Sequence, residues 1–191
     1  MELEKLLTFE IKDKKLLFRT IVESDVTEDY VTGLREQAEY IENIPNNINI
    51  SNQKEYVNNT NFSEYNTICG LFLDEVLVGT AGVQLSLSDS FLKNIDIQVA
   101  MLATVGIFIF NKSYRGMGLG KILVWASTYL FHECTRIEWF GAGMAKENIP
   151  SLKSFLSCGF QKVYEDYEVC KTLLNQSNLV TPSFIHGVKL I

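Results

Sequence analysis

Apolar and polar residues follow two different periods along this chain, and the changes between them predict its elements. The run 16–22 is rich in apolar and β-branched residues and predicts a strand. Residues 30–34 place apolar side chains at helical spacing, and Ser24 or Asp25 is the predicted cap of that helix. A second, short helix is predicted over 51–58, with Ser51 as its cap. The chain therefore opens as a strand followed by two helices.

The middle of the chain has a strand-like pattern. Residues 69–85 predict a hairpin that turns at Asp74-Glu75. A loop is predicted over 88–96, and the long apolar run 99–110 predicts a central strand. This part contributes three strands, which is enough to form the middle of a sheet.

The last part returns to the helical period. Apolar residues from 119 to 130 predict a helix, and 136–143 predict a strand. A further helix over 148–158 ends at Gly159, a residue type that commonly ends helices, and one or two strands follow. The segment 175–191 ends in a strand-like run of no evident role. The order of elements predicts a single domain, residues 1–191, with a mixed α/β layer arrangement.

The junction between the central strand and the following helix carries the most informative chemistry. Three glycines allow the backbone to approach a ligand closely, and the N–H groups that begin the helix favour an anion. The glycines are Gly116, Gly118 and Gly120, and the nearby cations are Lys112, Arg115 and Lys121. This combination predicts a site for a pyrophosphate.

Spacing separates the motifs that share this chemistry. The dinucleotide pattern G-x-G-x-x-G fails because Lys121 stands where its third glycine belongs. The P-loop pattern fails because Ile122 follows Gly120-Lys121 where a serine or threonine is required. The pattern R-x-x-G-x-G fits, with Arg115, Gly118 and Gly120, and resembles the acetyl-coenzyme A loop of the GNAT superfamily of N-acetyltransferases. A glycine-rich turn that only caps a helix is the alternative interpretation.

A second motif strengthens the resemblance. The segment from Asn148 through Ser151 and Phe155 to Gly159-Phe160 resembles the second GNAT signature, N-x-x-[AS]-x-x-x-[YF]-x-x-x-G-F. The two motifs stand in the family's order, and the resemblance covers roughly residues 14 to 171. It implies a mostly antiparallel sheet splayed between its fourth and fifth strands, with acetyl-CoA in the gap. The opening of the chain resembles the branch of ribosomal-protein-alanine and amino-sugar acetyltransferases.

The resemblance also assigns a set of cofactor-binding residues. The end of the central strand would line the pantetheine, the glycine loop would hold the pyrophosphate, and the start of the later helix would contact the pantetheine amide. These residues are Phe108, Ile109, Phe110, Arg115, Gly116, Met117, Gly118, Leu119, Gly120, Lys121, Asn148 and Ser151. For Phe108 and Phe110 the alternative is a place in the core, and for Asn148 it is a helix cap.

The catalytic residues depart from the common GNAT pattern. Many members have a tyrosine at the position of Phe155, which has no proton to donate. Ser151 resembles the serine of the ribosomal-protein branch and could donate a hydrogen bond to the leaving sulfur. Because residues 99–110 contain no acid, Glu138 is the predicted substitute for the base.

Three other routes for the proton of the amine stay open. Asp96 could replace Glu138, and His132 has a suitable ring but a distant place on its helix. A chain of water to solvent is the third route.

Composition narrows the class of protein. The net charge of −6 and pI near 5.0 argue against a protein that binds nucleic acid through a basic face. Four cysteines without a C-x-x-C pair, and only two histidines, predict reduced thiols and no metal site. No basic leader or apolar run of about 20 residues is evident, so we expect a cytoplasmic protein with no membrane partner.

The sequence thus favours an acetyl-CoA-dependent N-acetyltransferase that acts on a small-molecule amine, such as an amino sugar. A protein N-terminal acetyltransferase and a non-catalytic acetyl-CoA-binding module are the alternatives, and a nucleotide-binding protein is a third. A homodimer is expected only by analogy with the family.

Overall fold

The chain folds around one large sheet. The computed structural model describes residues 1, 3, 5–12, 14–36, 47–87, 91–93, 95, 97 and 99–191. Within them, nine strands form a sheet in the order β7-β8-β6-β5-β4-β3-β2-β1-β9. The strands are β1 (Leu7–Ile11), β2 (Lys14–Thr20), β3 (Asn66–Leu73), β4 (Val76–Leu87), β5 (Met101–Phe108), β6 (Trp139–Ala145), β7 (Gln161–Glu165), β8 (Val169–Asn175) and β9 (His186–Leu190). Every neighbouring pair is antiparallel except β5 and β6, which are parallel.

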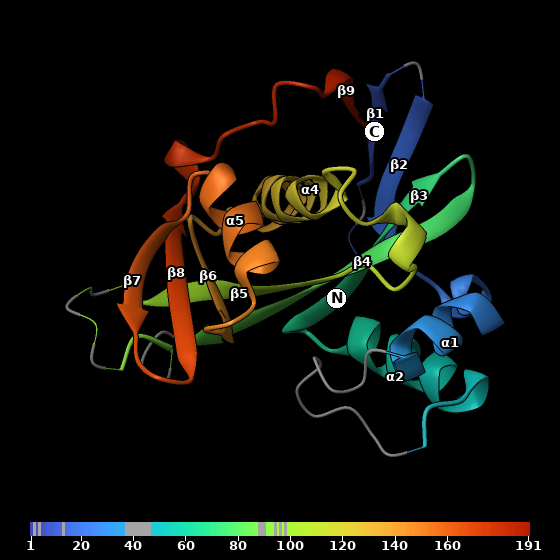
Figure 1. Cartoon of the computed structure of the whole chain (residues 1–191), viewed down its shortest axis with the longest axis horizontal. Helices are drawn as coiled ribbons and strands as arrows, with labels where there is room; N and C mark the ends of the chain where they lie inside the picture. Colours follow the sequence, from blue (N-terminus) through green and yellow to red (C-terminus); the bar gives the residue numbers. More distant parts are fainter. Residues whose placement is uncertain are drawn as a thin grey trace.

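Helices cover both faces of this sheet. The α-helices are α1 (Glu28–Glu36), α2 (Ile50–Phe62), α4 (Leu119–Thr135) and α5 (Ile149–Ser157), and the short 3-10 helices are η1 (Glu23–Asp25), η3 (Lys112–Tyr114) and η4 (Gln176–Asn178). Figure 1 shows α4 and α5 on one side of the sheet and α1 and α2 on the other. No helix among the described residues is both long and apolar enough to cross a membrane.

The alternation of side chains along the central strands explains this layering. Ala81, Val83 and Val105 are buried in the main core, which also includes Ile122 and Leu123 of α4. Successive side chains of a strand point to opposite faces. The residues between these core positions therefore face the side of α1 and α2.

The two central parallel strands pair only over a short stretch. β5 and β6 are in register at Ala103↔Phe140 and Thr104↔Gly141. Beyond that point β5 continues to pair with β4, up to Thr80↔Phe108, while β6 continues to pair with β8. The sheet therefore divides into two arms toward the carboxyl ends of β5 and β6. The GNAT resemblance predicted this division between the fourth and fifth strands, which are β5 and β6 here because β1 precedes the first predicted strand.

The predicted fold class is confirmed, and so is the hairpin turn between β3 and β4. Asp74 and Glu75 both have positive φ, at 50° and 66°. The strand β1 was missed, and the predicted loop over 88–96 lies partly outside the described residues. The strand-like end of the chain is confirmed as β9.

The predicted cap of the first helix is wrong. Ser24 and Asp25 lie in η1, and the hydroxyl of Thr27 instead accepts from the backbone N–H of Tyr30 at 3.3 Å. Asp25 is occupied by a different interaction, described below. Asp25, a residue type that caps helices well, thus stabilises the turn before the helix instead of the helix itself.

The predicted cap of the second helix is also wrong. Asn49, rather than Ser51, caps α2, because its side chain accepts from the backbone N–H of Asn52 at 2.9 Å. Both residue types cap helices well. Their order along the chain could not be resolved from propensity alone.

The C-terminal strap, residues 176–191, connects the two arms of the sheet (Figure 1). After β8 and η4 it passes the end of α5, where the N–H of Val180 donates to the carbonyl of Cys158 at 3.0 Å. It then crosses α4, where the indole of Trp125 donates to the Thr181 hydroxyl at 3.0 Å. It ends as β9 on the edge of β1. The strap therefore joins the β6–β8 arm to the opposite edge of the sheet.

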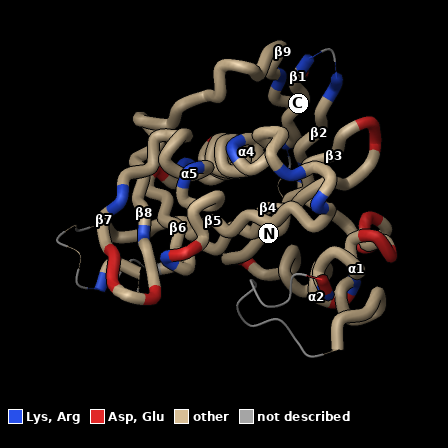
Figure 2. The backbone as a smooth tube through the Cα atoms, in the orientation of Figure 1, with Lys and Arg blue, Asp and Glu red and all other residues tan. Residues whose placement is uncertain are grey.

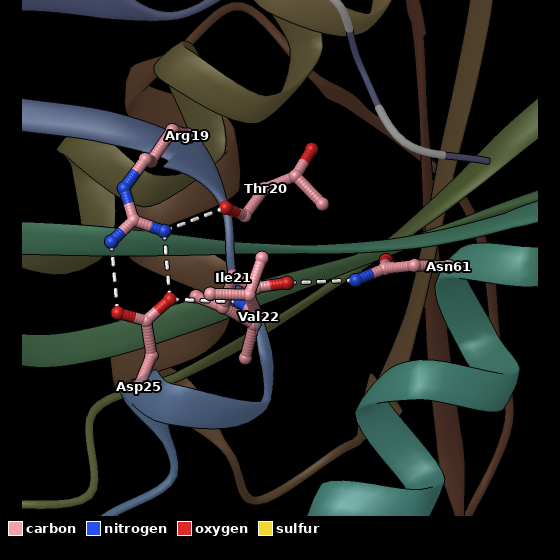
Figure 3. A network of polar contacts seen from close by, with 6 residues as sticks. All are labelled: Arg19, Thr20, Ile21, Val22, Asp25 and Asn61. Carbon is pink, nitrogen blue, oxygen red and sulfur yellow. Dashed lines mark hydrogen bonds and ion pairs between the residues drawn. The ribbon is translucent and has the colours of Figure 1, made fainter.

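A compact ionic cluster fixes the turn between β2 and η1 (Figure 3). The Arg19 guanidinium donates to both Asp25 oxygens, at 2.7 and 2.8 Å, and lies 4.3 Å from the centre of the Phe72 ring. Asp25 also accepts from the N–H of Val22 at 2.8 Å. Burial alone would raise the pKa of Asp25, but the bonds from Arg19 and Val22 outweigh it, so this pKa lies below its ordinary value.

The side chain of Asn61 holds α2 to the same part of the sheet. Its amide donates to the carbonyl of Ile21 at 2.8 Å, and its oxygen accepts from the N–H of Ile68 at 3.2 Å (Figure 3). One side chain thus satisfies both an acceptor at the end of β2 and a donor in β3.

We expect Asp25→Asn to lower the free energy of unfolding at pH 7 by about 2 kcal/mol, because it leaves Arg19 without its carboxylate. Since the pKa of Asp25 is lowered by folding, its contribution is present above the unfolded pKa of about 3.9 and is lost as pH falls through the folded value. The difference between wild type and variant should therefore shrink below about pH 4. Urea unfolding at several pH values would measure it.

Asp74→Asn is the matched control for this prediction. Its ion pair with Lys14, at 3.5 Å, is largely exposed on both sides, and such pairs contribute little. Equal losses in the two variants would contradict a special role for the Arg19–Asp25 pair.

Candidate active site

The glycine loop leaves the end of β5 where the sheet divides. Asn111 fixes its first turn, because the side-chain oxygen accepts from the N–H and hydroxyl of Ser113, at 3.0 and 2.6 Å. The N–H of Arg115 then donates to the carbonyl of Lys112 at 3.1 Å and closes η3. These local bonds set the direction in which the glycines enter α4.

The three glycines of the loop serve different purposes. Gly116 and Gly118 have positive φ, at 76° and 83°, which only glycine adopts without strain. Gly120 has no such requirement, but a Cβ built there would lie 2.7 Å from the hydroxyl oxygen of Ser154. The first two glycines thus shape the loop, and the third permits α4 and α5 to approach each other.

The start of α4 presents positive potential. Gly118 is the N-cap and offers no side chain to the first N–H groups of the helix. The N–H groups of Leu119 and Gly120 cannot find acceptors inside the helix, and the helix dipole adds to their partial charge. Arg115 is exposed and Lys121 half-buried beside them. Basic positions, blue in Figure 2, lie along the loop and the first turn of α4.

Lys112 differs from the other two cations. Its ammonium pairs with the carboxylate of Glu36 at 3.3 Å, and both side chains are exposed. This pair ties the loop to the end of α1. Arg115 and Lys121 are therefore the better candidates for contact with an anion at the helix start.

The phenylalanines at the end of β5 have side chains in the core. Phe110 is buried and packs edge-on to Tyr30, with ring centroids 5.4 Å apart. Phe108 is half-buried against the same cluster, on the side of α1 and α2. Ile109 is half-buried against the core on the α4 side. The core interpretation of the Phe108 and Phe110 side chains is confirmed, and contact between the backbone of this segment and a ligand stays a prediction.

Asn148 and Ser151 lie at the start of α5. The Asn148 oxygen caps the helix by accepting from the N–H of Ser151 at 3.2 Å. The cap interpretation of Asn148 is thus confirmed, and Ser151 is half-buried in the first turn. Phe155 is buried and packs against Phe160, with ring centroids 5.0 Å apart.

The contacts between α4 and α5 join this helix start to the glycine loop. Gly120 approaches Ser154, and the thiol of Cys158 contacts the carbonyl of Lys121 at 3.3 Å. Burial raises the pKa of Cys158 to about 11, so it is a neutral thiol at physiological pH. Cys158 therefore helps to pack the helices and is a poor nucleophile.

The structure does not bring Glu138 to this region. It is exposed just before β6, at the end of the strand opposite to the division of the sheet, and its carbonyl accepts from the N–H of Gln176 at 2.7 Å. His132 lies in the last turn of α4, where its ring contacts the carbonyl of Ile137 at 2.8 Å. Asp96 lies outside the described residues. The base predicted from the sequence is thus not found beside Ser151.

Phe184 was missed by the sequence analysis. A Cβ built at Gly118 would lie 3.2 Å from the tip of this ring, so the C-terminal strap packs directly on the glycine loop. No signal in the sequence could have identified this contact, because it joins residues that are far apart in the chain. In the described part of the chain, no three His, Cys, Asp or Glu side chains gather into a group that could hold a metal.

Comparison with known proteins agrees with this arrangement. A family model described as "Acetyltransferase (GNAT) domain" matches residues 15–161. No curated protein sequence is matched. Solved structures show the fold at low identity, beginning with an uncharacterized protein of Bacillus halodurans at TM-score 0.73 and 19% identity over 93% of each chain.

Two further structures were solved with forms of coenzyme A. RimJ of Mycobacterium smegmatis, in complex with CoA-disulfide, has a TM-score of 0.72 and 11% identity over 95% of this chain and 92% of its own. The aminoglycoside acetyltransferase AAC(6')-Ib, with ribostamycin and coenzyme A, has a TM-score of 0.68 and 16% identity over 85% and 94%. The family match spans most of the chain, and the divided sheet and glycine loop agree with it. The chain belongs to the GNAT family and is an acetyltransferase.

Proposed function

We propose that the protein transfers the acetyl group of acetyl-CoA to the primary amine of a small molecule, with amino sugars as the leading class. The observation that best supports this proposal is the position of the glycine loop. It begins the helix α4 directly after β5, beside the point where β5 and β6 separate. This arrangement would suit both parts of acetyl-CoA. Its pyrophosphate would bind at the start of α4, and its pantetheine would extend between the separated strands.

Two groups of residues would hold acetyl-CoA. The first N–H groups of α4, with Arg115 and Lys121, would bind the pyrophosphate. The backbone of residues 108–110 would contact the pantetheine, and Asn148 and Ser151 would face it from α5. The fit rests on the positive φ of Gly116 and Gly118, and on the open space at Gly116, where no described atom lies within 4 Å of a built Cβ.

The chemistry requires the amine to be neutral when it attacks. An alkylammonium with a pKa of about 10 has no lone pair, so a proton must leave before the new N–C bond forms and the C–S bond breaks. No acid lies in β5, and Glu138 is remote. We therefore assign this proton to water leading to solvent, and assign to Ser151 a hydrogen bond to the departing sulfur.

Protein N-terminal acetylation is the second candidate. It is favoured by the similarity to RimJ, which covers 95% of this chain. Other structures of this fold include the aminoglycoside enzyme and a chimera of the spermidine N-acetyltransferase SpeG from Vibrio cholerae with hSSAT. A panel containing amino sugars, polyamines and peptides would distinguish the candidates by release of free thiol from acetyl-CoA. A protein that binds acetyl-CoA but releases no thiol with any amine would be a binding module.

We expect Arg115→Glu to weaken binding of acetyl-CoA by about 10-fold or more, because a cation beside the pyrophosphate becomes an anion. Isothermal titration calorimetry would measure the Kd. Arg136→Glu is the matched control, since Arg136 is an exposed arginine at the opposite end of the same helix. If wild type showed no binding at saturating acetyl-CoA, the proposed function would be wrong.

We expect Ser151→Ala to lower kcat by about 10-fold or more and leave the Kd of acetyl-CoA within about twofold, because the hydroxyl acts on charge that develops during the reaction. Ser157→Ala is the control on the same helix, where the hydroxyl donates to the carbonyl of Ser154. An unchanged kcat would contradict this role and show that Ser151 serves only the structure of the first turn of α5.

Glu138→Gln tests the base predicted from the sequence. Since Glu138 lies at the far end of β6, we expect kcat and its pH profile to stay within about twofold of wild type, well short of the loss on removing a general base. A large fall in kcat that is relieved at high pH would restore Glu138 as the base.

A further inference from the structure

Three glycines form a row across the sheet at the point where it divides. Gly82 of β4 is paired directly with Gly106 of β5. The last register pair of β5 and β6 is Thr104↔Gly141. Gly106 and Gly143 each lie two residues beyond this pair, at the same level on the two separating strands. We call Gly82, Gly106 and Gly143 the glycine row.

The row faces away from α4. The neighbouring residues Ala81, Val105 and Ala142 belong to the core on the α4 side, so the glycines between them face the side of α1 and α2. All three glycines are exposed. The row therefore lies on the opposite face from the glycine loop, across the gap between β5 and β6.

The residues that the structure describes give no packing or backbone reason for glycine at these positions. None of the three has a positive φ. No described atom lies within 4 Å of a Cβ built at Gly82 or Gly106, and at Gly143 the nearest is an ordinary contact of 4.0 Å with the Phe91 ring. Glycine in a strand interior weakens the strand, and it often marks the close approach of a ligand.

Other strand glycines show the contrast. A Cβ at Gly70 would lie 2.4 Å from Ile21, and one at Gly141 would lie 2.7 Å from Phe91. Packing alone accounts for glycine at those two positions. It does not account for the glycine row.

The chemistry around the row is uncharged or cationic. On the same face, β4 presents Gln84, and β5 presents Thr104, whose hydroxyl donates to the Gln84 carbonyl at 3.3 Å. Lys171 of β8 pairs in register with Gly143, and its ammonium donates to the carbonyl of Phe91 at 2.8 Å. Hydroxyl and carboxamide groups suit a hydroxylated molecule, whereas an ammonium opposes a polycation.

We propose that the glycine row is the seat of the acceptor, and that the acceptor is an amine carried on a hydroxylated ring, which lies flat on the backbone of β4, β5 and β6. This inference rests on the proposed function. The paired strands β4 and β5 are about 4.8 Å apart, and β6 lies beyond them at more than that spacing, so the three strands offer a floor of about 10 Å or more, wide enough for a sugar ring. The amine would reach the acetyl group through the gap beside Gly106.

The test uses Gly82→Val and Gly106→Val in the full chain. Valine is favoured in strands, so each variant should be as stable as wild type or melt about 1–3 °C higher. The Kd of acetyl-CoA should stay within about twofold, because the glycine loop is on the other face. Wild type should acetylate at least one ring amine among D-glucosamine, D-galactosamine and D-mannosamine, measured by thiol release.

With the best ring amine, kcat/KM should fall at least 10-fold in each variant, while any activity with ethanolamine or spermidine should change less than about threefold. Gln161→Val, an exposed strand position on β7, is the control and should leave all values unchanged. Full activity of the variants with the ring amine would overturn the inference, as would equal loss with ring and chain amines, or a wild type that acetylates no ring amine. A wild type that does not bind acetyl-CoA would instead overturn the proposed function itself.

Discussion

The arrangement of this protein depends on where one hydrogen-bond ladder stops. β5 and β6 pair at only two register positions and then separate, each held by its other neighbour. If the ladder continued, an extended ligand could not pass between β5 and β6. A ligand bound at the start of α4 would then not reach the opposite face of the sheet. The separation is possible because β4 and β8 satisfy one edge of each strand. The energetic cost of the open edges is therefore limited to a few backbone groups.

The sequence predicted the features that depend on residues close together in the chain. It could not predict those that depend on contacts between separate elements. Gly116, Gly118 and the Asn148 cap follow from backbone and capping chemistry within a few residues, so motif spacing identified them. Phe184 and the Gly120–Ser154 contact join separate elements, and nothing in the local pattern indicates them. Glu138 was chosen because it was an acid on a predicted strand, but the strand begins beside it and places it at the wrong end. The strand β1 was missed because its short run gains its stability from pairing on both sides.

Glycine has at least three physical roles in this one fold. In the loop it supplies left-handed backbone, and between α4 and α5 it removes a clash. In the glycine row neither role applies among the described residues, and glycine weakens the strands there. Such positions separate the demands of folding from those of function, because adding a side chain there should raise stability and lower turnover.

The pairing of β9 with β1 has a consequence for how the fold is reached. Leu7 pairs with Leu190, and Leu6 and Ile191 exchange backbone hydrogen bonds, so this ladder joins residues separated by almost the whole described sequence. Contacts of such separation are slow to form, because a very long loop must close first. On the ribosome, β1 can pair with β2 early but must keep its other edge open until the strap has emerged. The nascent domain thus presents an unprotected strand edge, with the attendant risk of association between chains, through nearly all of its synthesis.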